Sequence, residues 1–367
     1  MHFALELAAQ HGTPFYVYDL TVLRHRVRHA RAAMPAKVLF AVKANPNPEL
    51  LRALHGEVDG LDIASRGEIE TALECGFAGE TLSFTGPAKS DDALAFAVEH
   101  DVLINVESMR ELTQLLTFKT LARVRLRVNP RVTLKSWRVS MWGAPSPFGI
   151  DEEALEPALS LARQLRFDGL HVHPGGQCTS VGGYLAAAKA ALDLAEKYDA
   201  PALNFGGGWG VTADAELDVR AAGEKLRAML ERFRDATGRE LRTFVEPGRW
   251  LAAPCGLYVA RVVSQKVSRG THFVLLDGGL NHHLGATGLL GGERLRVVNL
   301  SRNDGPVVTR TLVGPLCTPL DTFGEHTLVE PRDGDLLGIE GSGAYGPSFS
   351  PTRFLSHAPP REFVREG

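Results

Sequence analysis

Cysteine is scarce in this chain, and its four cysteines are far apart and form no Cys-x-x-Cys pair. This spacing gives no zinc or disulfide signature and is typical of a reducing compartment, so we expect a cytoplasmic protein. Long apolar runs are also missing: no stretch of roughly 18 apolar residues is present, and we expect no membrane-spanning helix. The first residues lack a basic start followed by an apolar stretch, so the sequence predicts no signal peptide.

An excess of charge of one sign is missing as well. The 40 Lys and Arg residues and 43 Asp and Glu residues give a net charge of -3, which argues against a dedicated nucleic-acid binder. With 367 residues, 44% of them hydrophobic, the chain is long enough for a large core and too long for one typical domain. We therefore expect one large domain and one smaller domain.

The chain does contain a repeated alternation of short apolar strands with helices. Strands are expected at 38–42, 60–64, 82–85, 102–106, 123–128, 170–173, 202–205 and 242–246. Helices are expected at 48–54, from 67 onward, and at 91–99, 109–117, 152–166, 184–198 and 220–237. About eight such units is the count of a closed (β/α)8 barrel, although an open doubly wound sheet alternates in the same way.

The pattern changes after Leu251. The remaining residues contain short strands, such as those expected at 256–263, 271–276 and 336–340, with many Gly and Pro turns and no long helix. This predicts a mostly β second domain. We therefore expect the barrel at 20–254 and the β domain at 255–367, with the β-prone segment inside 1–19 pairing into the β domain.

Lys43 directly follows the first barrel strand, where barrels of this kind place their chemistry. A lysine at such a site is partly desolvated, which lowers its pKa and makes the neutral amine a nucleophile for an aldehyde. Taken alone, an ordinary lysine that extends to solvent is the commoner explanation.

Two further strand ends carry residues suited to a phosphorylated ring. The run Gly206, Gly207 and Gly208 would let the backbone approach a phosphate, although a tight turn is the commoner reason for such a run. The motif Glu246-Pro-Gly248-Arg249 supplies a carboxylate that could keep a pyridine nitrogen protonated and a guanidinium that could bind phosphate or carboxylate. The alternative for the second motif is a surface turn with an ion pair.

Three other residues remain ambiguous from sequence alone. His171 and His173 could form a metal pair, but no Asp, Glu or Cys accompanies them at ligand spacing, so we predict no metal and favour His173 stacking on a flat ring. Cys317 is a lone cysteine, which is usually a small core residue, and Tyr345 could be a plain aromatic anchor.

Together, these motifs occur in one order over nearly the whole chain, and that order resembles the fold-type-III, alanine-racemase-like decarboxylases that use pyridoxal 5'-phosphate (PLP), the group of ornithine and diaminopimelate decarboxylases. The motifs are Ala-Val-Lys43-Ala-Asn-Pro, Asp62-Ile-Ala-Ser-Arg-Gly-Glu68, Asn105-Val-Glu-Ser108, Arg127-Val-Asn-Pro130, His171-Val-His173-Pro-Gly-Gly-Gln177, Asn204-Phe-Gly-Gly-Gly-Trp-Gly210, Glu246-Pro-Gly-Arg249, Gly314-Pro-Leu-Cys317 and Gly343-Ala-Tyr345-Gly346.

The resemblance implies a PLP decarboxylase that works as a head-to-tail homodimer with shared active sites. It implies that Lys43 holds PLP as a Schiff base, that His173 stacks on the ring, and that Glu246 pairs with the pyridine nitrogen. It further implies that Cys317 reaches the neighbouring subunit's site, where it is our candidate proton donor. The implied phosphate ligands are Gly206, Gly207, Gly208, Arg249 and Tyr345. One residue departs from the pattern, because Gly176 stands where the family usually has Ser.

The substrate motifs also depart from the diamino acid pattern. Decarboxylases of free diamino acids usually have an acidic residue after the cysteine, and here that residue is Thr318. The Asn-x-Arg-Pro-x-Leu-Tyr stretch of diaminopimelate decarboxylases is replaced by an apolar, glycine-rich loop at 284–292. The motif Cys317-Thr-Pro-Leu-Asp321 resembles a subgroup that includes decarboxylases of aminoacyl groups on carrier proteins. We expect Thr318, Asp321 and Arg249 to contact the substrate.

Alternatives stay open. One is a free diamino acid whose distal group is read by His282 or His283. A racemase is disfavoured by Glu246, since alanine-type racemases place Arg at the pyridine nitrogen. A non-catalytic PLP-binding protein would leave the β domain without a purpose. For an acidic carrier, a basic docking face is expected at Arg24, Arg28 and Arg31, although a solvated helix face explains these residues equally well.

Overall fold

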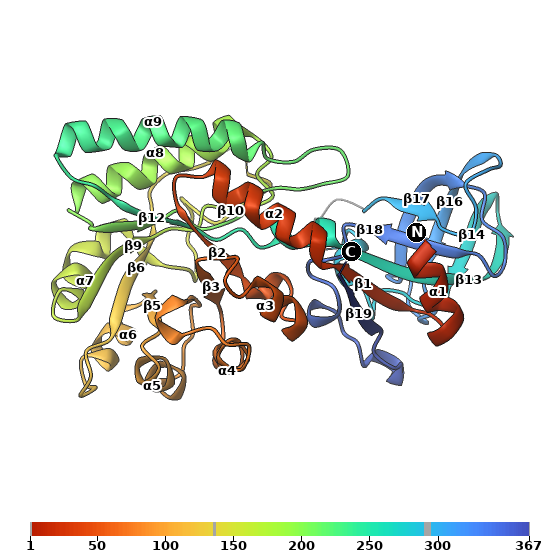
Figure 1. The fold of residues 1–367 in the computed structure, drawn as a ribbon, viewed down its shortest axis with the longest axis horizontal. Helices are drawn as coiled ribbons and strands as arrows, with labels where there is room; N and C mark the ends of the chain where they lie inside the picture. Colours follow the sequence, from red (N-terminus) through yellow and green to blue (C-terminus); the bar gives the residue numbers. More distant parts are fainter. Residues whose placement is uncertain (1, 135–136, 290–294, 367) are drawn as a thin grey trace. The chain divides into compact units, whose positions relative to one another are not determined.

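The computed structural model describes residues 2–134, 137–289 and 295–366, and it consists of two compact units (Figure 1). The barrel unit comprises Arg24–Val211 and Ala215–Leu251, and the β unit comprises Met1–Leu23, Thr212–Asp214 and Ala252–Gly367. The last part of the apolar loop that the sequence places at 284–292 lies outside the described residues. In the part of the chain that the structure describes, no helix is both long and apolar enough to cross a membrane.

The barrel unit is built on eight parallel strands that pair in a closed ring, which confirms the predicted (β/α)8 barrel. In ring order the strands are β2 (Lys37–Ala41), β3 (Gly60–Ile63), β4 (Leu82–Phe84), β5 (Leu103–Val106), β6 (Arg123–Asn129), β9 (Arg166–His171), β11 (Ala202–Asn204) and β12 (Arg242–Val245). Because all eight strands run in one direction, their carboxyl ends meet at one mouth of the barrel.

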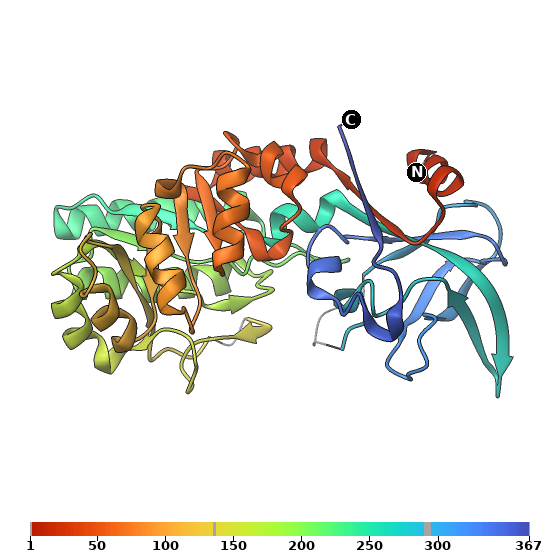
Figure 2. The same ribbon diagram turned by 90° about the horizontal axis from the view of Figure 1, so that it is seen from below.

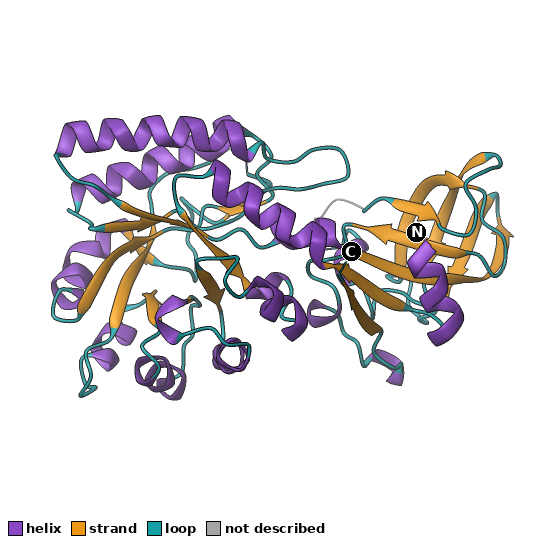
Figure 3. Cartoon of the chain, in the orientation of Figure 1, coloured by secondary structure: helices purple, strands orange, loops and turns teal. Residues whose placement is uncertain are grey.

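Helices cover the outside of the barrel, as Figure 3 shows. They are α2 (Leu20–Ala33), α3 (Pro48–Leu54), α4 (Arg66–Glu74), α5 (Asp91–Glu99), α6 (Met109–Leu115), α7 (Leu155–Ala162), α8 (Val181–Lys197) and α9 (Val219–Thr237), with the short α10 (Arg249–Ala252) after the last strand. Serine begins several of them: Ser65, Ser90 and Ser108 each accept a backbone N–H of the first turn and so cap α4, α5 and α6. The two longest helices, α8 and α9, lie side by side on one flank of the barrel (Figure 1).

The interior of the barrel contains charge as well as apolar side chains. Along β6, Arg125 and Arg127 are as buried as the valines and leucines with which they alternate. Each is neutralised inside the unit, Arg125 by Asp168 at 2.6 Å and Arg127 by Glu107 at 2.8 Å. A buried cation requires such a partner. The alternation of Arg with Val and Leu predicts a strand, but it does not reveal which side chains the barrel encloses.

The β unit holds one sheet of eight strands and the helix α1 (His2–His11). Its strands are β1 (Phe15–Asp19), β13 (Gly256–Ser268), β14 (Thr271–Leu276), β15 (Val297–Asn299), β16 (Val307–Val313), β17 (Thr322–Val329), β18 (Leu336–Glu340) and β19 (Arg361–Arg365). The long β13, drawn as a curved strand in Figure 2, pairs antiparallel with β14, β18 and β1. β1 also pairs in parallel with β19, so the first and last strands of the chain are neighbours.

Some element boundaries differ from the sequence-based expectation. β9 begins at Arg166 and ends at His171, whereas the apolar pattern indicated 170–173, because Arg166, Asp168 and Gly169 interrupt the apolar run at the start of the strand. β13 continues to Ser268, beyond the expected end at 263, because its last residues, Ser-Gln-Lys-Val-Ser, are mostly polar and exposed along a hairpin, so that no apolar run marks them. Two small strands outside the ring, β7 (Val139–Ser140) and β10 (Gly175–Gly176), pair with each other, and β8 (Ile150–Asp151) adds to β6.

Candidate active site

Lys43 lies in a single 3-10 turn (Val42–Ala44) directly after β2, at the carboxyl-end mouth of the barrel. Its Nζ is 3.4 Å from Oδ2 of Asp62, which follows on the next strand, β3. The side chain of Lys43 is 41% exposed, while that of Asp62 is 2% exposed. The desolvation expected from sequence therefore falls on the carboxylate, and the amine remains accessible to a ligand at this mouth.

Asp62 connects Lys43 to a chain of polar side chains from successive strands. Thr85, after β4, donates to Oδ1 of Asp62 at 2.8 Å, and Asn105 on β5 donates to Thr85 and to Ser83, each at 2.8 Å. Burial and the nearby charge of Glu246 raise the pKa of Asp62 to about 6, against the opposing effects of Lys43 and Thr85. The carboxylate is thus held in a fixed position beside the amine, and it takes up a proton at a higher pH than an ordinary aspartate does.

Glu246 follows β12 and is buried at 3% exposure. Its two oxygens are held separately: Asn204 Nδ2 lies 2.6 Å from Oε1, and His171 Nε2 lies 3.0 Å from Oε2. Burial raises the pKa of Glu246, which Lys43, Asn204 and two interior arginines partly offset. Burial also lowers the pKa of His171 well below its usual value, so the imidazole is neutral and binds Glu246 as an N–H donor.

The glycine run after β11 packs tightly against the segment that follows β9. A Cβ on Gly206 would lie 2.4 Å from the Val172 carbonyl oxygen, and Gly206 and Gly208 have φ values of 71° and 83°. Only glycine meets both requirements. The Gly207 N–H donates to Nδ1 of His173 at 3.3 Å, which joins the predicted ring-stacking histidine to the predicted phosphate loop.

Gly248 brings the Glu-Pro-Gly-Arg turn against the lysine turn. A Cβ at Gly248 would lie 2.9 Å from the Cβ of Ala44 and 3.1 Å from that of Ala41. Arg249 is the first residue of α10 and is half-buried. Lys43 follows the first barrel strand, β2, and Glu246 and Arg249 follow the last, β12. These two strands pair with each other, so the three residues come to the same part of the barrel mouth.

The other predicted residues belong to the β unit. Cys317 is exposed and Thr318 is half-buried in the turn between β16 and β17. Tyr345, which follows β18, has a positive φ of 56° and packs edge-on against Phe349.

Asp321 has surroundings that the sequence did not suggest. It is 4% exposed, and its carboxylate accepts the backbone N–H of Leu280 at 2.6 Å and of Leu316 at 2.7 Å. Gly279 and Gly314 pack directly on this carboxylate, where a Cβ would lie 2.3 Å from an oxygen. Through these hydrogen bonds the buried side chain connects the loop that carries Cys317 to the loop after β14.

The two histidines considered as readers of a distal substrate group are buried inside the β unit. His282 Nδ1 lies 3.3 Å from the Tyr258 hydroxyl and its Nε2 2.9 Å from the Ala358 carbonyl oxygen. His283 Nε2 lies 2.9 Å from Ser342 Oγ. Burial lowers the pKa of His282, so this imidazole is neutral.

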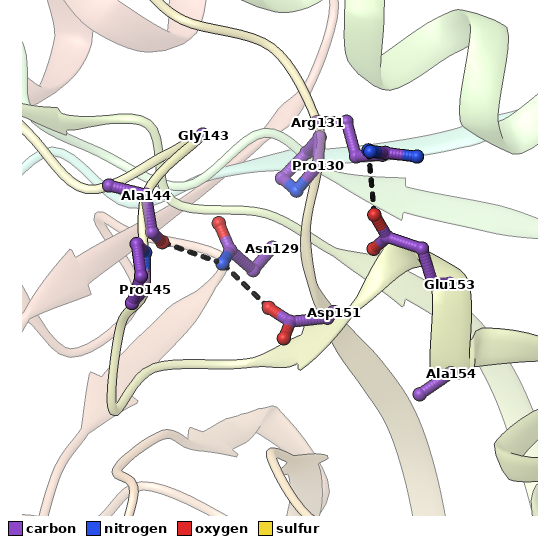
Figure 4. Close-up of a pocket in the computed structure, with 9 residues that line it drawn as sticks. All are labelled: Asn129, Pro130, Arg131, Gly143, Ala144, Pro145, Asp151, Glu153 and Ala154. Atoms are coloured by element: carbon purple, nitrogen blue, oxygen red, sulfur yellow. Dashed lines mark hydrogen bonds and ion pairs between the residues drawn. The ribbon is translucent and has the colours of Figure 1, made fainter.

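A pocket of about 520 Å³ opens at the end of β6, beside β8 (Figure 4). Asn129 crosses it, donating to Asp151 at 2.8 Å and to the Ala144 carbonyl at 3.2 Å, and Arg131 pairs with Glu153 at 2.6 Å. Most of these polar groups pair with one another, and the lining contains none of the catalytic, cofactor-binding or substrate-binding residues predicted from sequence, although Asn129 and Pro130 belong to the Arg127-Val-Asn-Pro130 motif. In the described part of the chain, no group of three His, Cys, Asp or Glu side chains gathers as metal ligands would.

Comparison with known proteins identifies the family. The family described as "Pyridoxal-dependent decarboxylase, pyridoxal binding domain" matches residues 20–253. L-glutamyl-[BtrI acyl-carrier protein] decarboxylase of Niallia circulans is 32% identical, covering 98% of this chain and 90% of that protein. Diaminopimelate decarboxylase of Deinococcus radiodurans is 34% identical, covering 99% and 93%. The crystal structure of diaminopimelate decarboxylase from Helicobacter pylori complexed with L-lysine superimposes with a TM-score of 0.85 at 27% identity, covering 99% and 94%.

The chain therefore belongs to the family of pyridoxal-dependent decarboxylases, of fold type III. It is an enzyme, its cofactor is PLP, and its reaction class is decarboxylation. The mouth of the barrel fits this cofactor: it offers an accessible lysine amine, a buried carboxylate with fixed orientation, and a glycine loop where no Cβ can be accommodated.

Several residues of this mouth had no role assigned from sequence. His171 was considered only as half of a metal pair, and Asn204 only as the start of the glycine motif. Asp62 and Asn105 stood in recognised motifs without a role, and Thr85 stood in none. A usable signal was present, because each is a polar residue at the carboxyl end of a predicted buried strand or just after it, where barrels place functional groups.

Proposed function

We propose that this enzyme decarboxylates an acidic aminoacyl group, of glutamyl or aspartyl type, held as a thioester on a carrier protein. The printed name of the Niallia circulans relative gives that kind of substrate to a protein 32% identical over almost the whole chain. The observation in this structure that carries the proposal is the burial of His282 and His283: both ring nitrogens of His282, and Nε2 of His283, lie within hydrogen-bond distance of groups of their own unit.

A free diamino acid requires a partner for its distal ammonium, because an unpaired charge in a desolvated pocket costs about as much as breaking a buried ion pair, roughly 3–5 kcal/mol. Thr318, which replaces the usual acidic residue, accepts the Leu320 N–H at 3.3 Å within its own turn. Neutral, buried His282 is unsuited to that task as well. A thioester at the side-chain carboxyl leaves no distal charge, so these residues suit a tethered substrate.

The cofactor-site roles follow the resemblance and the geometry. We assign Lys43 as the covalent attachment point, Glu246 as the partner of the pyridine nitrogen and His173 as the stacking residue. When bound, PLP supplies a sink for the electrons left at the α-carbon as carbon dioxide departs. The phosphate is assigned to Gly206, Gly207, Gly208, Arg249 and Tyr345.

The enzyme is further proposed to act as a homodimer in which Cys317 of one subunit donates a proton at the site of the other. Cys317 is exposed in its own chain. Large apolar side chains are exposed on the same loop and on the segment after Tyr345, where a monomer gains nothing from them. They are Leu320 at 53%, Phe349 at 45%, Phe354 at 45% and Leu355 at 47% exposure. A second copy of the chain would cover such surface.

The basic face expected on α2 is a poor docking site for a carrier. Arg28 pairs with Glu57 at 2.8 Å, and Arg31 pairs with Asp59 at 3.1 Å. Asp59 directly precedes β3, so Arg31 lies at the amino ends of the strands, opposite the mouth that holds Lys43. Arg24 lies seven residues before Arg31, about 10 Å away along the helix axis. We therefore assign Arg28 and Arg31 to local ion pairs.

A decarboxylase of a free diamino acid is the second candidate, favoured by the 34% identity to a diaminopimelate decarboxylase. A carbon dioxide release assay distinguishes the two. Purified enzyme is given glutamyl or aspartyl thioesters of a carrier protein, the free acids, diaminopimelate, ornithine and lysine, with Lys43→Ala as the inactive control. We expect the highest kcat/KM for a carrier-bound substrate. An equal or higher kcat/KM for a free diamino acid would replace our proposal by the second candidate.

A further inference from the structure

The mouth of the barrel opposite Lys43 contains a second cavity, of about 420 Å³, between the amino ends of the strands. Nine charged side chains line it, and five of them are basic: Lys37, Arg123, Arg125, Arg166 and Arg242. The chemistry of the carboxyl-end mouth does not require this cavity. Its charge arrangement indicates a separate function.

The carboxylates at this cavity are each shared by two arginines. Asp168 pairs with Arg125 at 2.6 Å and with Arg242 at 2.9 Å. Asp101 pairs with Arg166 at 2.6 Å and approaches Arg123 at 3.8 Å. Four guanidinium groups therefore converge on two carboxylates, and this cluster carries two positive charges in excess.

The remaining charges at the cavity do not remove this excess. Asp59 is already paired with Arg31, which lies outside the cavity, and its second oxygen accepts the Val38 N–H at 2.9 Å. Lys37 and Glu80 bring one charge of each sign. A concave site with excess positive charge attracts small anions.

Arg125 adds a second, independent observation. Its side chain is 2% exposed, its Nε and Nη2 bind Asp168, and it stacks 3.9 Å from the centre of the Phe244 ring. Its Nη1 is buried and has no hydrogen-bond acceptor among residues 2–134, 137–289 and 295–366. A buried guanidinium N–H without an acceptor is costly, and an oxyanion in the cavity that Arg125 lines would relieve that cost.

We propose that this cavity is a binding site for a small, doubly charged tetrahedral oxyanion: phosphate, either free or as the head of a phosphate monoester. The guanidinium groups of Arg166 and Arg242 are half exposed at its rim, and their N–H groups beyond those bound to Asp101 and Asp168 suit charge-assisted contacts to such oxygens. The site is distinct from the glycine loop proposed for the cofactor phosphate, because it lies at the opposite ends of the same strands.

The test uses the PLP-loaded enzyme, so that the cofactor occupies its own phosphate site. Inorganic phosphate and glycerol phosphate are titrated separately by calorimetry in a buffer without other oxyanions, with sodium chloride at matched ionic strength. Arg166→Gln and Arg242→Gln change side chains at the rim and leave the buried Arg125–Asp168 pair in place. Arg220→Gln is the matched control, because this substitution removes the same charge at a distant surface site. Arg220 forms an exposed pair with Glu224 on α9.

We expect saturable binding with one site per subunit and a rise in Tm on adding phosphate. Each rim variant should weaken binding by about tenfold, the effect of losing one charge-assisted contact, while Arg220→Gln should leave it unchanged. Preference for glycerol phosphate over inorganic phosphate would identify a monoester as the ligand, and the reverse would identify the free ion. Absence of saturable binding, or equal binding by the rim variants and Arg220→Gln, would overturn the proposal.

Discussion

His171 Nε2 lies 3.0 Å from Oε2 of Glu246, and both side chains are enclosed in the barrel. Because burial keeps His171 neutral, it orients the carboxylate without neutralising it. Asn204 fixes the other oxygen in the same way. The negative charge of Glu246 is therefore preorganised and available for a cation brought by the ligand, such as a protonated ring nitrogen.

Glu246→Gln should slow decarboxylation by about 10²- to 10³-fold while weakening PLP binding much less, because the charge matters most as electrons flow into the ring. The measurement is kcat, together with cofactor affinity from fluorescence titration. The amide is isosteric and its oxygen can still accept from Asn204 or His171, so only one of these two donors loses its acceptor and the fold should be preserved, at a cost of about 1–3 kcal/mol. Loss of PLP affinity as the main defect would assign Glu246 a structural role.

Lys43→Ala should abolish the covalent link between protein and cofactor. The wild-type enzyme should absorb at roughly 420 nm and retain labelled cofactor on one peptide after borohydride reduction. The variant should lose both signals, and mutation of Lys37, a lysine at the other end of β2, should lose neither. A borohydride adduct on any lysine other than Lys43 would contradict the assignment of the whole site.

A mixture of Lys43→Ala and Cys317→Ala subunits should regain activity if active sites are shared. In a mixed dimer one site combines both mutations and the other is intact, so an equal mixture should recover about a quarter of wild-type activity. Subunit exchange must be verified independently, for example with differently tagged chains. No recovery in exchanged dimers would mean that each site is built within one chain.

Asp321→Asn should lower thermal stability and kcat without raising KM. The amide nitrogen would face the N–H of Leu280 or Leu316, leaving a buried donor without an acceptor at a cost of about 1–3 kcal/mol. The Cys317 loop would lose its attachment, so the alkylation rate of Cys317 should change as well. A rise in KM at unchanged stability would instead support the direct substrate contact that the sequence suggested.

The buried carboxylate of Asp62 should make stability depend on pH. Its folded pKa, about 6, exceeds the ordinary value of 3.8, so the folded protein binds this proton more tightly than the unfolded chain. Its contribution is therefore most favourable below about pH 4 and is lost as the pH rises through 6, by about 3 kcal/mol in total. In the cofactor-free protein, urea unfolding at pH 4 to 7 should show Asp62→Asn gaining stability relative to wild type with rising pH. A constant difference would contradict the raised pKa.

The order of strands and helices could be predicted from sequence because each barrel strand is a short apolar run at regular spacing. Lys43, Glu246 and the three glycines could be located for the same reason, as each follows such a run. The pairing of Glu246 with His171 could not, because it depends on closure of the barrel, which brings β9, β11 and β12 together.

Two other features are invisible to periodicity. Arg125 and Arg127 alternate with apolar residues in the way a half-exposed strand does, yet the closed barrel buries both faces of β6. In the sequence, Asp321 is one more polar residue near the cysteine. Its burial depends on Gly279 and Gly314, whose backbones pack directly against its carboxylate. In each case the burial is decided by segments distant in sequence.

The pairing of β1 with β13 and β19 has a consequence for biosynthesis. β1 leaves the ribosome early, but Tyr18 pairs with Gly256 and Val364, which are translated some 240 and 350 residues later. At about 5–20 residues per second, the apolar strand Phe15–Asp19 waits at least ten seconds for its first partner, while the barrel folds between them. An unpaired apolar strand is prone to wrong association, so the nascent chain should depend on chaperones during this interval.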